Sequence, residues 1–407
     1  MISPEEALAR VLAKVRPLPV EEADLTGALG RALAEDVLAD IDLPPFTRSA
    51  MDGFAVRSAD LAAVPVELAV ADEIAAGAVP RRAVGPGECA RIMTGAPLPE
   101  GADAVVMVER TEPGAADRVR VLVQAKPGEN VIERGCDARA GTVVLPAGTV
   151  LSPGAIAVAA AAGRPRLAVH RRPRAAFLST GDELVAVERQ PGPGQVRNSN
   201  AHAFAAQLAL EGGSLAFSRI VRDTVEETRL AIREGLAADL LVLSGGVSMG
   251  EFDLVARALA EENVEIHFHK IALKPGKPLL FGTRGETAVF GLPGNPVSSY
   301  MTFLLFVAPA LRRMLGRRDP EPRHVTARLS GGPLRTRDRI QYVPARLEPA
   351  AGGFSARPLL WHGSGDLVPL HAANGFIAVP VGDAPLADGA AVRVLVDERQ
   401  IAPFARG

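Results

Sequence analysis

The segment from Arg174 to about Arg318 alternates short apolar runs with helical patterns, and this alternation constrains the fold more than any other feature of the chain. Residues 175–178 and 240–243 are apolar runs of strand length. Between them, Thr224 stands three residues before Glu227, which is the capping-box spacing of a helix start. This order of strands and helices predicts an α/β protein with a doubly wound, mostly parallel sheet covered on both faces.

The rest of the chain has a different sequence pattern, with short β-type runs broken by Pro and Gly. Such runs between residues 42 and 139 predict a β-rich domain inserted into the chain. The β pattern after residue 320 predicts a C-terminal domain like a small barrel, with a sandwich as the alternative. We therefore expect four domains: a parallel-sheet domain (1–20 and 173–320), a small discontinuous linking domain (21–41 and 140–172), the inserted β-rich domain (42–139) and the C-terminal β domain (321–407).

Charge, cysteine usage and apolar runs exclude several classes of protein. A net charge of −2 and a pI near 6.4 give no reason to expect nucleic-acid or membrane binding. Cys89 and Cys136 lie too far apart in the sequence for a CxxC pair, and we expect both to be inert. The N-terminus lacks the apolar block of a signal peptide, and no apolar run reaches the roughly 18 residues of a membrane span. We expect a soluble cytoplasmic protein.

Lysine usage points to an anion site. The chain has only five lysines, and three of them, Lys270, Lys274 and Lys277, lie within one short segment. Arginine supplies positive charge elsewhere, so compact ammonium groups in this segment predict that it holds an anion. A chance cluster on a solvated face is the alternative interpretation. Nearby, His267 and His269 share one face of a strand, where a structural role is favoured over zinc because no third ligand is near.

Glycine-rich loops follow several expected strands, at the edge where an open parallel sheet binds its ligands. SGGVSMG (244–250) and GLPGNPVSS (291–299) expose backbone N–H groups ahead of a helix, an arrangement that cradles anions. A tight turn and a rigid connector are the alternatives. Four acids would repel an anion at this edge unless a hard cation such as Mg²⁺ bridges them to it: Asp182, Glu183, Asp223 and Asp253.

Seven motifs, taken in order, carry a family resemblance: SAMDGFAV (49–56), RIMTGAPLPEGADAVVMVE (91–109), GENVIERGCDARAG (128–141), STGDEL, LSGGVSMGEFD, KIALKPGKP and GLPGNPVSS. They closely resemble the molybdopterin molybdenumtransferases, the MoeA family, which is similar to the E domain of gephyrin and of plant Cnx1. The resemblance covers roughly residues 1–320 and continues more thinly through GSGDL (363–367) and ANGF (373–376).

The resemblance implies an enzyme that takes adenylylated molybdopterin and molybdate, requires Mg²⁺, releases AMP and yields molybdenum cofactor. It also implies a homodimer in which the inserted domain reaches the partner's parallel-sheet domain. Further partners would be the molybdopterin adenylyltransferase and acceptor molybdoenzymes. Two alternatives stay open. The parallel-sheet domain also resembles the MogA-like adenylyltransferase that performs the preceding step with ATP, and the gephyrin relative is a scaffold protein.

Motif by motif, the resemblance also assigns roles to residues. Asp52, Thr94 and Asp137 in the inserted domain match positions implicated in activity. The catalytic and metal cluster is expected from Glu183, Asp223, Asp253 and Lys270, with the first three as metal ligands. The molybdate and substrate pocket is expected from these residues: Lys274, Lys277, Ser298, Arg339, Ser364 and the loop residues Gly245, Gly246 and Ser248.

Overall fold

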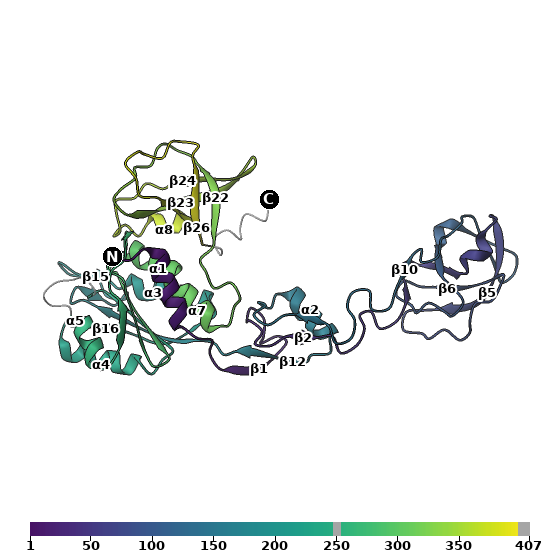
Figure 1. The fold of residues 1–407 in the computed structure, drawn as a ribbon, viewed down its shortest axis with the longest axis horizontal. Helices are drawn as coiled ribbons and strands as arrows, with labels where there is room; N and C mark the ends of the chain where they lie inside the picture. The colour runs from purple at the N-terminus through teal and green to yellow at the C-terminus, as the bar shows by residue number, and fades with distance from the viewer. Residues whose placement is uncertain (247–253, 398–407) are drawn as a thin grey trace.

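A six-stranded sheet forms the core of the main body in this computed structural model, which describes residues 1–246 and 254–397 (Figure 1). Its strand order is β16-β13-β17-β21-β20-β18. The first four strands are parallel, and the last two pair antiparallel at one edge. The strands are β13 (Arg174–Thr180), β16 (Ser214–Val221), β17 (Leu240–Ser244), β18 (Glu265–Phe268), β20 (Leu280–Arg284) and β21 (Thr287–Leu292). The predicted mostly parallel sheet is confirmed.

Helices cover both faces of this sheet because successive strand residues point to opposite sides. Phe177 and Val242 face one core with Phe290, whereas the neighbouring Leu178 and Leu241 face the other. The first core is closed by α1 (Pro4–Lys14), α3 (Ser199–Leu210), α6 (Pro296–Thr302), the π-helical turn Phe303–Val307 and α7 (Ala308–Met314). The second is closed by α4 (Val225–Gly235) and α5 (Leu254–Glu261).

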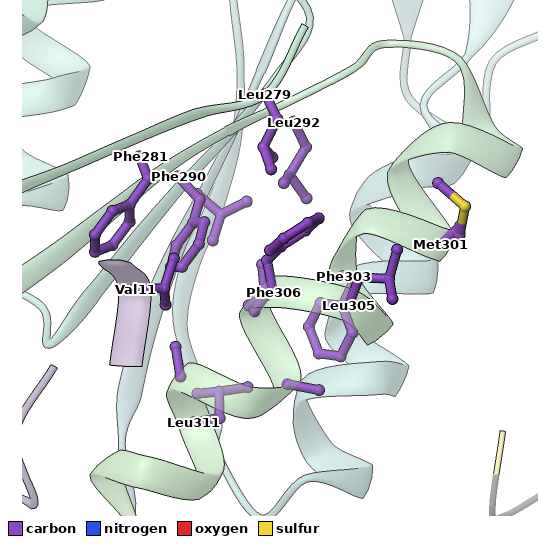
Figure 2. Close-up of a cluster of buried hydrophobic side chains, with 14 of the residues drawn as sticks. Val11, Leu279, Phe281, Phe290, Leu292, Met301, Phe303, Leu305, Phe306 and Leu311 are labelled. Carbon is purple, nitrogen blue, oxygen red and sulfur yellow. The ribbon is translucent and has the colours of Figure 1, made fainter. Parts of the chain in front are cut away.

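The phenylalanines of the strands interdigitate with those of the helices in the larger core (Figure 2). Phe281 and Phe290 extend from the sheet toward Phe303 and Phe306, and Val11 of α1 completes the contact. All of these side chains are fully or almost fully buried. This packing fixes α6, whose first turn borders the cavity described below.

An extended arm leaves this body through three two-stranded antiparallel ribbons. Each pairs an outgoing segment with a returning one: β1 (Val20–Asp24) with β12 (Arg166–His170), β2 (Val37–Leu38) with β11 (Val143–Leu145), and β3 (Arg48–Ser49) with β10 (Val131–Ile132). Helix α2 (Pro153–Ala161) packs beside the second ribbon. The molecule is therefore elongated, with the parallel sheet at one end and a second six-stranded sheet at the other (Figure 1).

The distal sheet belongs to the inserted segment and has the order β7-β4-β6-β5-β9-β8. Its strands are β4 (Gly53–Val56), β5 (Val66–Ile74), β6 (Glu88–Ile92), β7 (Ala104–Met107), β8 (Thr111–Pro113) and β9 (Arg118–Val121). Short 3₁₀ helices at Ser58–Leu61 and Val108–Arg110 connect them. The predicted β-rich insertion is thus observed as a sheet of its own.

The C-terminal strands close into a small barrel, as predicted. Pairing of β23 with both β24 and β25 completes a five-stranded ring. The ring contains β22 (His324–Leu329), β23 (Ile340–Ala350), β24 (Gly353–Pro358), β25 (Gly375–Val379) and β26 (Ala391–Val396), with the short α8 (Pro369–Ala372) nearby. The strand β19 (Leu273–Lys274) of the lysine segment pairs with β23 and so attaches this segment to the barrel. The exact domain boundaries given above stay a prediction.

Candidate active site

A cavity of about 680 Å³ opens at the carboxyl ends of the parallel strands. Its wall combines the ends of β13 and β17, the loop after β21, the short pair β14 (Leu184–Val185) and β15 (Val196–Arg197), and the first turn of α3. Gly365 and Leu367 of the barrel's 359–368 loop complete the wall. This is the edge at which an open α/β sheet binds its ligands.

Two glycine loops meet across this cavity. Gly245 has a φ of +92°, and a Cβ there would clash with the carbonyl oxygen of Thr180, so only glycine fits. Gly294 lies against the Cα of Gly245, so the two loops approach each other through bare backbone. The buried hydroxyl of Thr180 has no hydrogen-bond partner within the described part of the chain, and it faces Gly246. These loops place polar backbone and a hydroxyl where a ligand can use them.

Two asparagines of the RNSN string organise the cavity, and the sequence analysis missed both. The side-chain nitrogen of Asn200 donates to the hydroxyl of Ser244, at 2.9 Å, and to the carbonyl of Gly294, at 2.7 Å. It therefore joins the two glycine loops. Asn198 caps α3 through the amide of Ala201 and accepts a 3.0 Å hydrogen bond from Ser179. The sequence signal that could have identified them is the presence of two asparagines at a helix start, where asparagine is a preferred N-cap residue.

Carboxylates gather on one side of the cavity. Glu183 and Asp223 line it, and the amide of Asp223 donates to Asp182 at 3.4 Å. Partial burial raises the pKa of Asp223, and the negative charges of Asp182 and Glu183 raise it further. The charged form of Asp223 is therefore disfavoured until a cation offsets its neighbours.

The donor set at this position fits a magnesium ion only in part. No group of three His, Cys, Asp or Glu side chains able to hold a metal occurs in residues 1–246 and 254–397. The predicted ligand Asp253 and the predicted loop residue Ser248 lie outside the described residues. Glu183 and Asp223 supply the two carboxylates that Mg²⁺ commonly takes from a protein, since it completes its shell with water and phosphate oxygens.

The lysine segment lies beside this cavity rather than in its wall. Pro278 is its contribution to the wall, whereas Lys270, Lys274 and Lys277 are not part of it. Gly276 packs on Met301 of α6, which places the segment against that helix. Arg339 of the barrel donates to the carbonyl of Leu273 at 3.4 Å and so holds the segment from the other side.

Ser298 and Ser364 also lie at the junction of α6 and the barrel. Ser298 is buried, with 2% of its surface exposed, and its carbonyl accepts from Thr302. The Ser364 carbonyl accepts from the amide of Val297 at 3.0 Å, and its hydroxyl accepts from Asn295 at 2.8 Å. The barrel therefore caps the first turn of α6 at the rim of the cavity.

The expected residues of the inserted domain lie far from this cavity within one chain (Figure 1). Asp52 accepts from both the amide and the hydroxyl of Thr94, at 2.6 and 2.8 Å, and these hydrogen bonds lower the pKa of Asp52. Gly53 is required beside it because a Cβ would clash with the carbonyl of Val106. Asp137 is exposed and lines a separate groove at the root of the distal domain.

His267 and Cys89 have structural surroundings. His267 is half-buried and shares a 2.9 Å hydrogen bond with Thr283, and burial lowers its pKa. Cys89 is buried in the distal sheet, and burial raises the pKa of its thiol to about 12. A thiol with that pKa is unreactive near neutral pH.

Family models match three consecutive parts of the chain. Residues 2–163 match the MoeA N-terminal region (domains I and II), residues 176–313 match the “Probable molybdopterin binding domain”, and residues 326–396 match the MoeA C-terminal region (domain IV). In the described part of the chain, none of the helices has both the length and the hydropathy needed to cross a membrane.

Relatives match the chain over nearly its whole length. A molybdopterin molybdenumtransferase of Nostoc sp. is 38% identical over 92% of this chain and 88% of its own length. The protein of that name from Bacillus subtilis is 34% identical over 96% of this chain and 93% of its own length. A crystal structure of the molybdopterin biosynthesis MoeA protein of Pyrococcus horikoshii matches with a TM-score of 0.81 and 34% identity, over 98% of this chain and 99% of the other. The chain belongs to the MoeA family.

Proposed function

We propose that this chain is a molybdopterin molybdenumtransferase of molybdenum cofactor biosynthesis. It inserts molybdate into adenylylated molybdopterin, releases AMP and yields the cofactor, with Mg²⁺ required. The observation that carries the proposal is the cavity at the strand ends, which two glycine loops line together with the carboxylates of Glu183 and Asp223. Its volume of about 680 Å³ lies in the range of small-molecule sites, and the names of the relatives supply the substrate class.

Positioning and charge stabilisation are the work of the protein in this reaction. The loops at Gly245 and Gly294 present backbone to the phosphate groups of the pterin substrate, and Asn200 keeps the loops together. Lys274 and Lys277 hold molybdate as compact point charges, with Ser298, Arg339 and Ser364 around them. No protein nucleophile is needed, because the molybdenum is delivered to sulfur atoms of the substrate.

Glu183 and Asp223 would hold the magnesium ion, with Asp253 and Lys270 as further members of the cluster. Such an ion supplies positive charge that offsets the phosphate oxygens and orients them. The raised pKa of Asp223 supports this assignment, because its carboxylate is poised to gain from a nearby cation.

The active site is shared between two chains in our proposal. Asp52, Thr94 and Asp137 belong to the inserted segment, whose sheet stands away from the cavity of its own chain (Figure 1). A partner related by a twofold axis presents the same residues reciprocally. A stable dimer of this kind buries roughly 2,000 Å² or more in total.

A cytoplasmic location completes the proposal, together with supply of substrate by the molybdopterin adenylyltransferase and transfer of product to acceptor molybdoenzymes. The unpaired thiols of Cys89 and Cys136 fit a reducing compartment.

The decisive experiment mixes the purified protein with adenylylated molybdopterin, Mg²⁺ and molybdate, and follows AMP. We expect AMP release that depends on molybdate. A second reaction contains molybdopterin and ATP instead. Formation of adenylylated product in the second reaction, without molybdate-dependent AMP release in the first, would assign the preceding step and refute the proposal.

A further inference from the structure

The root of the arm holds a second, smaller cavity, of about 270 Å³, that the proposed reaction does not use. It lies where the loop 148–150 of the linking segment meets the end of α7 and the connection that follows it. The sequence of that connection, RRMLGRRDPEPR (312–323), is dense in arginine. Four arginines line the cavity: Arg312, Arg317, Arg318 and Arg323.

Glycines build this junction by letting its two sides approach closely. Gly316 lies against the ring of His170 in β12, and a Cβ there would clash with it. Gly148 lies in the same way against the stem of Arg318. The amide of Gly148 donates to Leu33 at 2.7 Å, which fixes the loop. The cavity wall is therefore defined by packing on both sides.

Ordinary structural roles account for the two inner arginines. Arg312 makes a bidentate ion pair with the buried Glu211, at 2.9 and 3.0 Å, and Arg317 reaches the same carboxylate at 3.5 Å. A position at the end of α7 also favours Arg312, since cations offset the negative end of a helix dipole. Glu211 therefore holds both of these guanidinium groups in place.

Neither role accounts for Arg318. Arg318 is exposed, its stem is packed on Gly148, and no hydrogen bond or ion pair joins its guanidinium to another residue in the described ranges. Arg323 lines the same cavity and is exposed. Among the side chains that line the cavity, four arginines stand beside a single acid, Asp319, so its lining is mainly cationic.

We propose that this junction binds a small tetrahedral oxyanion. The guanidinium fork suits the paired oxygens of phosphate, sulfate or molybdate. The volume is below the roughly 300–1,000 Å³ of pockets for larger organic ligands, which favours an ion over a whole nucleotide. An anion held here touches both the linking segment and the body, so it ties the arm to the parallel-sheet unit at its root.

The test measures binding of inorganic phosphate to the full chain by calorimetry, at constant ionic strength set with chloride. Arg318→Gln should weaken phosphate binding about tenfold or more, because it removes a charge-assisted contact. Arg323→Gln provides a second variant should the first fail to fold. Arg328→Gln is the matched control, since Arg328 is an exposed arginine of β22 that donates to Gly389 instead.

Parallel titrations with molybdate separate the two sources of the oxyanion. A loss of phosphate binding alone assigns the site to free phosphate, and a loss of part of the molybdate binding as well assigns it to tetrahedral oxyanions in general. AMP release by Arg318→Gln should stay at the wild-type level, which separates this site from the proposed active site. The inference is refuted if wild-type protein shows no saturable phosphate binding in the millimolar range, or if both glutamine variants bind phosphate as Arg328→Gln does.

Discussion

Replacement of Asn200 by alanine tests whether the spacing of the two glycine loops matters for the reaction. The change removes the hydrogen bonds to Ser244 and Gly294, at 2.9 and 2.7 Å. Each such bond contributes about 1 kcal/mol net, so the free energy of unfolding of the parallel-sheet unit should fall by about 2 kcal/mol. Ser244 is 3% exposed, which leaves its hydroxyl little access to water as a replacement partner.

The effect on activity should exceed the effect on stability. Without the hydrogen bonds of Asn200, the loop at Gly294 is free to move relative to Gly245, and a displacement near 1 Å costs roughly a hundredfold in rate. We expect kcat/KM for AMP release to fall by roughly ten- to a hundredfold at a temperature where the variant is fully folded. Urea denaturation gives the stability, and steady-state kinetics give the split between kcat and KM.

Gln207→Leu is the matched control for this prediction. Gln207 lies on the same helix, is buried, and donates to the carbonyl of Tyr300 at 3.3 Å, away from the cavity. This variant should lose about 1 kcal/mol of stability with kcat/KM unchanged. Equal losses of kcat/KM in the two variants would show that Asn200 acts through stability alone and would refute the argument.

Four further predictions concern the proposed site. Lys274→Ala should weaken molybdate binding about tenfold or more without unfolding the chain, and Lys277→Arg should also weaken it because a planar guanidinium does not replace a compact ammonium charge. Unchanged molybdate affinities in calorimetry would contradict both assignments. Chelation should stop AMP release and added Mg²⁺ should restore it, whereas turnover in excess chelator would argue against a metal role. The affinity for Mg²⁺ should fall as pH decreases through the raised pKa of Asp223, because the carboxyl takes up a proton there. Thr94→Val should raise the pKa of Asp52 in carboxyl NMR titrations, since it removes a hydrogen bond to the charged form, and a pKa that stays in place speaks against that bond. Co-expressed Asp52→Ala and Lys274→Ala chains, each inactive alone, should recover about a quarter of wild-type activity, because half of the dimers are mixed and one of the two sites in each mixed dimer is intact. Mixed dimers without activity would place both residues in one chain's site.

The central sheet was predictable because its signals are local. Residues 240–243 form an apolar run bounded by a glycine loop, and they are the core of β17. The capping-box spacing at Thr224 is observed as a 3.3 Å hydrogen bond from the amide of Glu227 to the Thr224 hydroxyl. Closure of the barrel by β23 and β25 is a different matter, since it depends on the register between segments far apart in sequence, which no local pattern specifies.

The candidate site likewise contains residues that local sequence signals predict and residues that depend on long-range contacts. Glu183 and Gly245 stand directly after strands, so their arrival at the cavity followed from the topology of a parallel sheet. Asn200 was missed because its two partners come from other strands, and its side chain gains a role only once the sheet is assembled. The attachment of Lys274 to the barrel through β19 likewise depends on a strand pairing of two residues, too short to leave a pattern.

The antiparallel pairing within the arm couples the lengths of its outgoing and returning segments. In the ribbon nearest the body, Val20–Asp24 pairs residue for residue with Arg166–His170. A one-residue insertion in only one of these strands shifts the pairing and turns every side chain beyond it to the opposite face. The distal sheet would then point in a new direction unless a bulge absorbs the extra residue, as occurs in the second ribbon between Val143 and Leu145. Homologues should therefore differ in the length of this arm by matched changes in both of its strands, or by an added residue that a bulge absorbs.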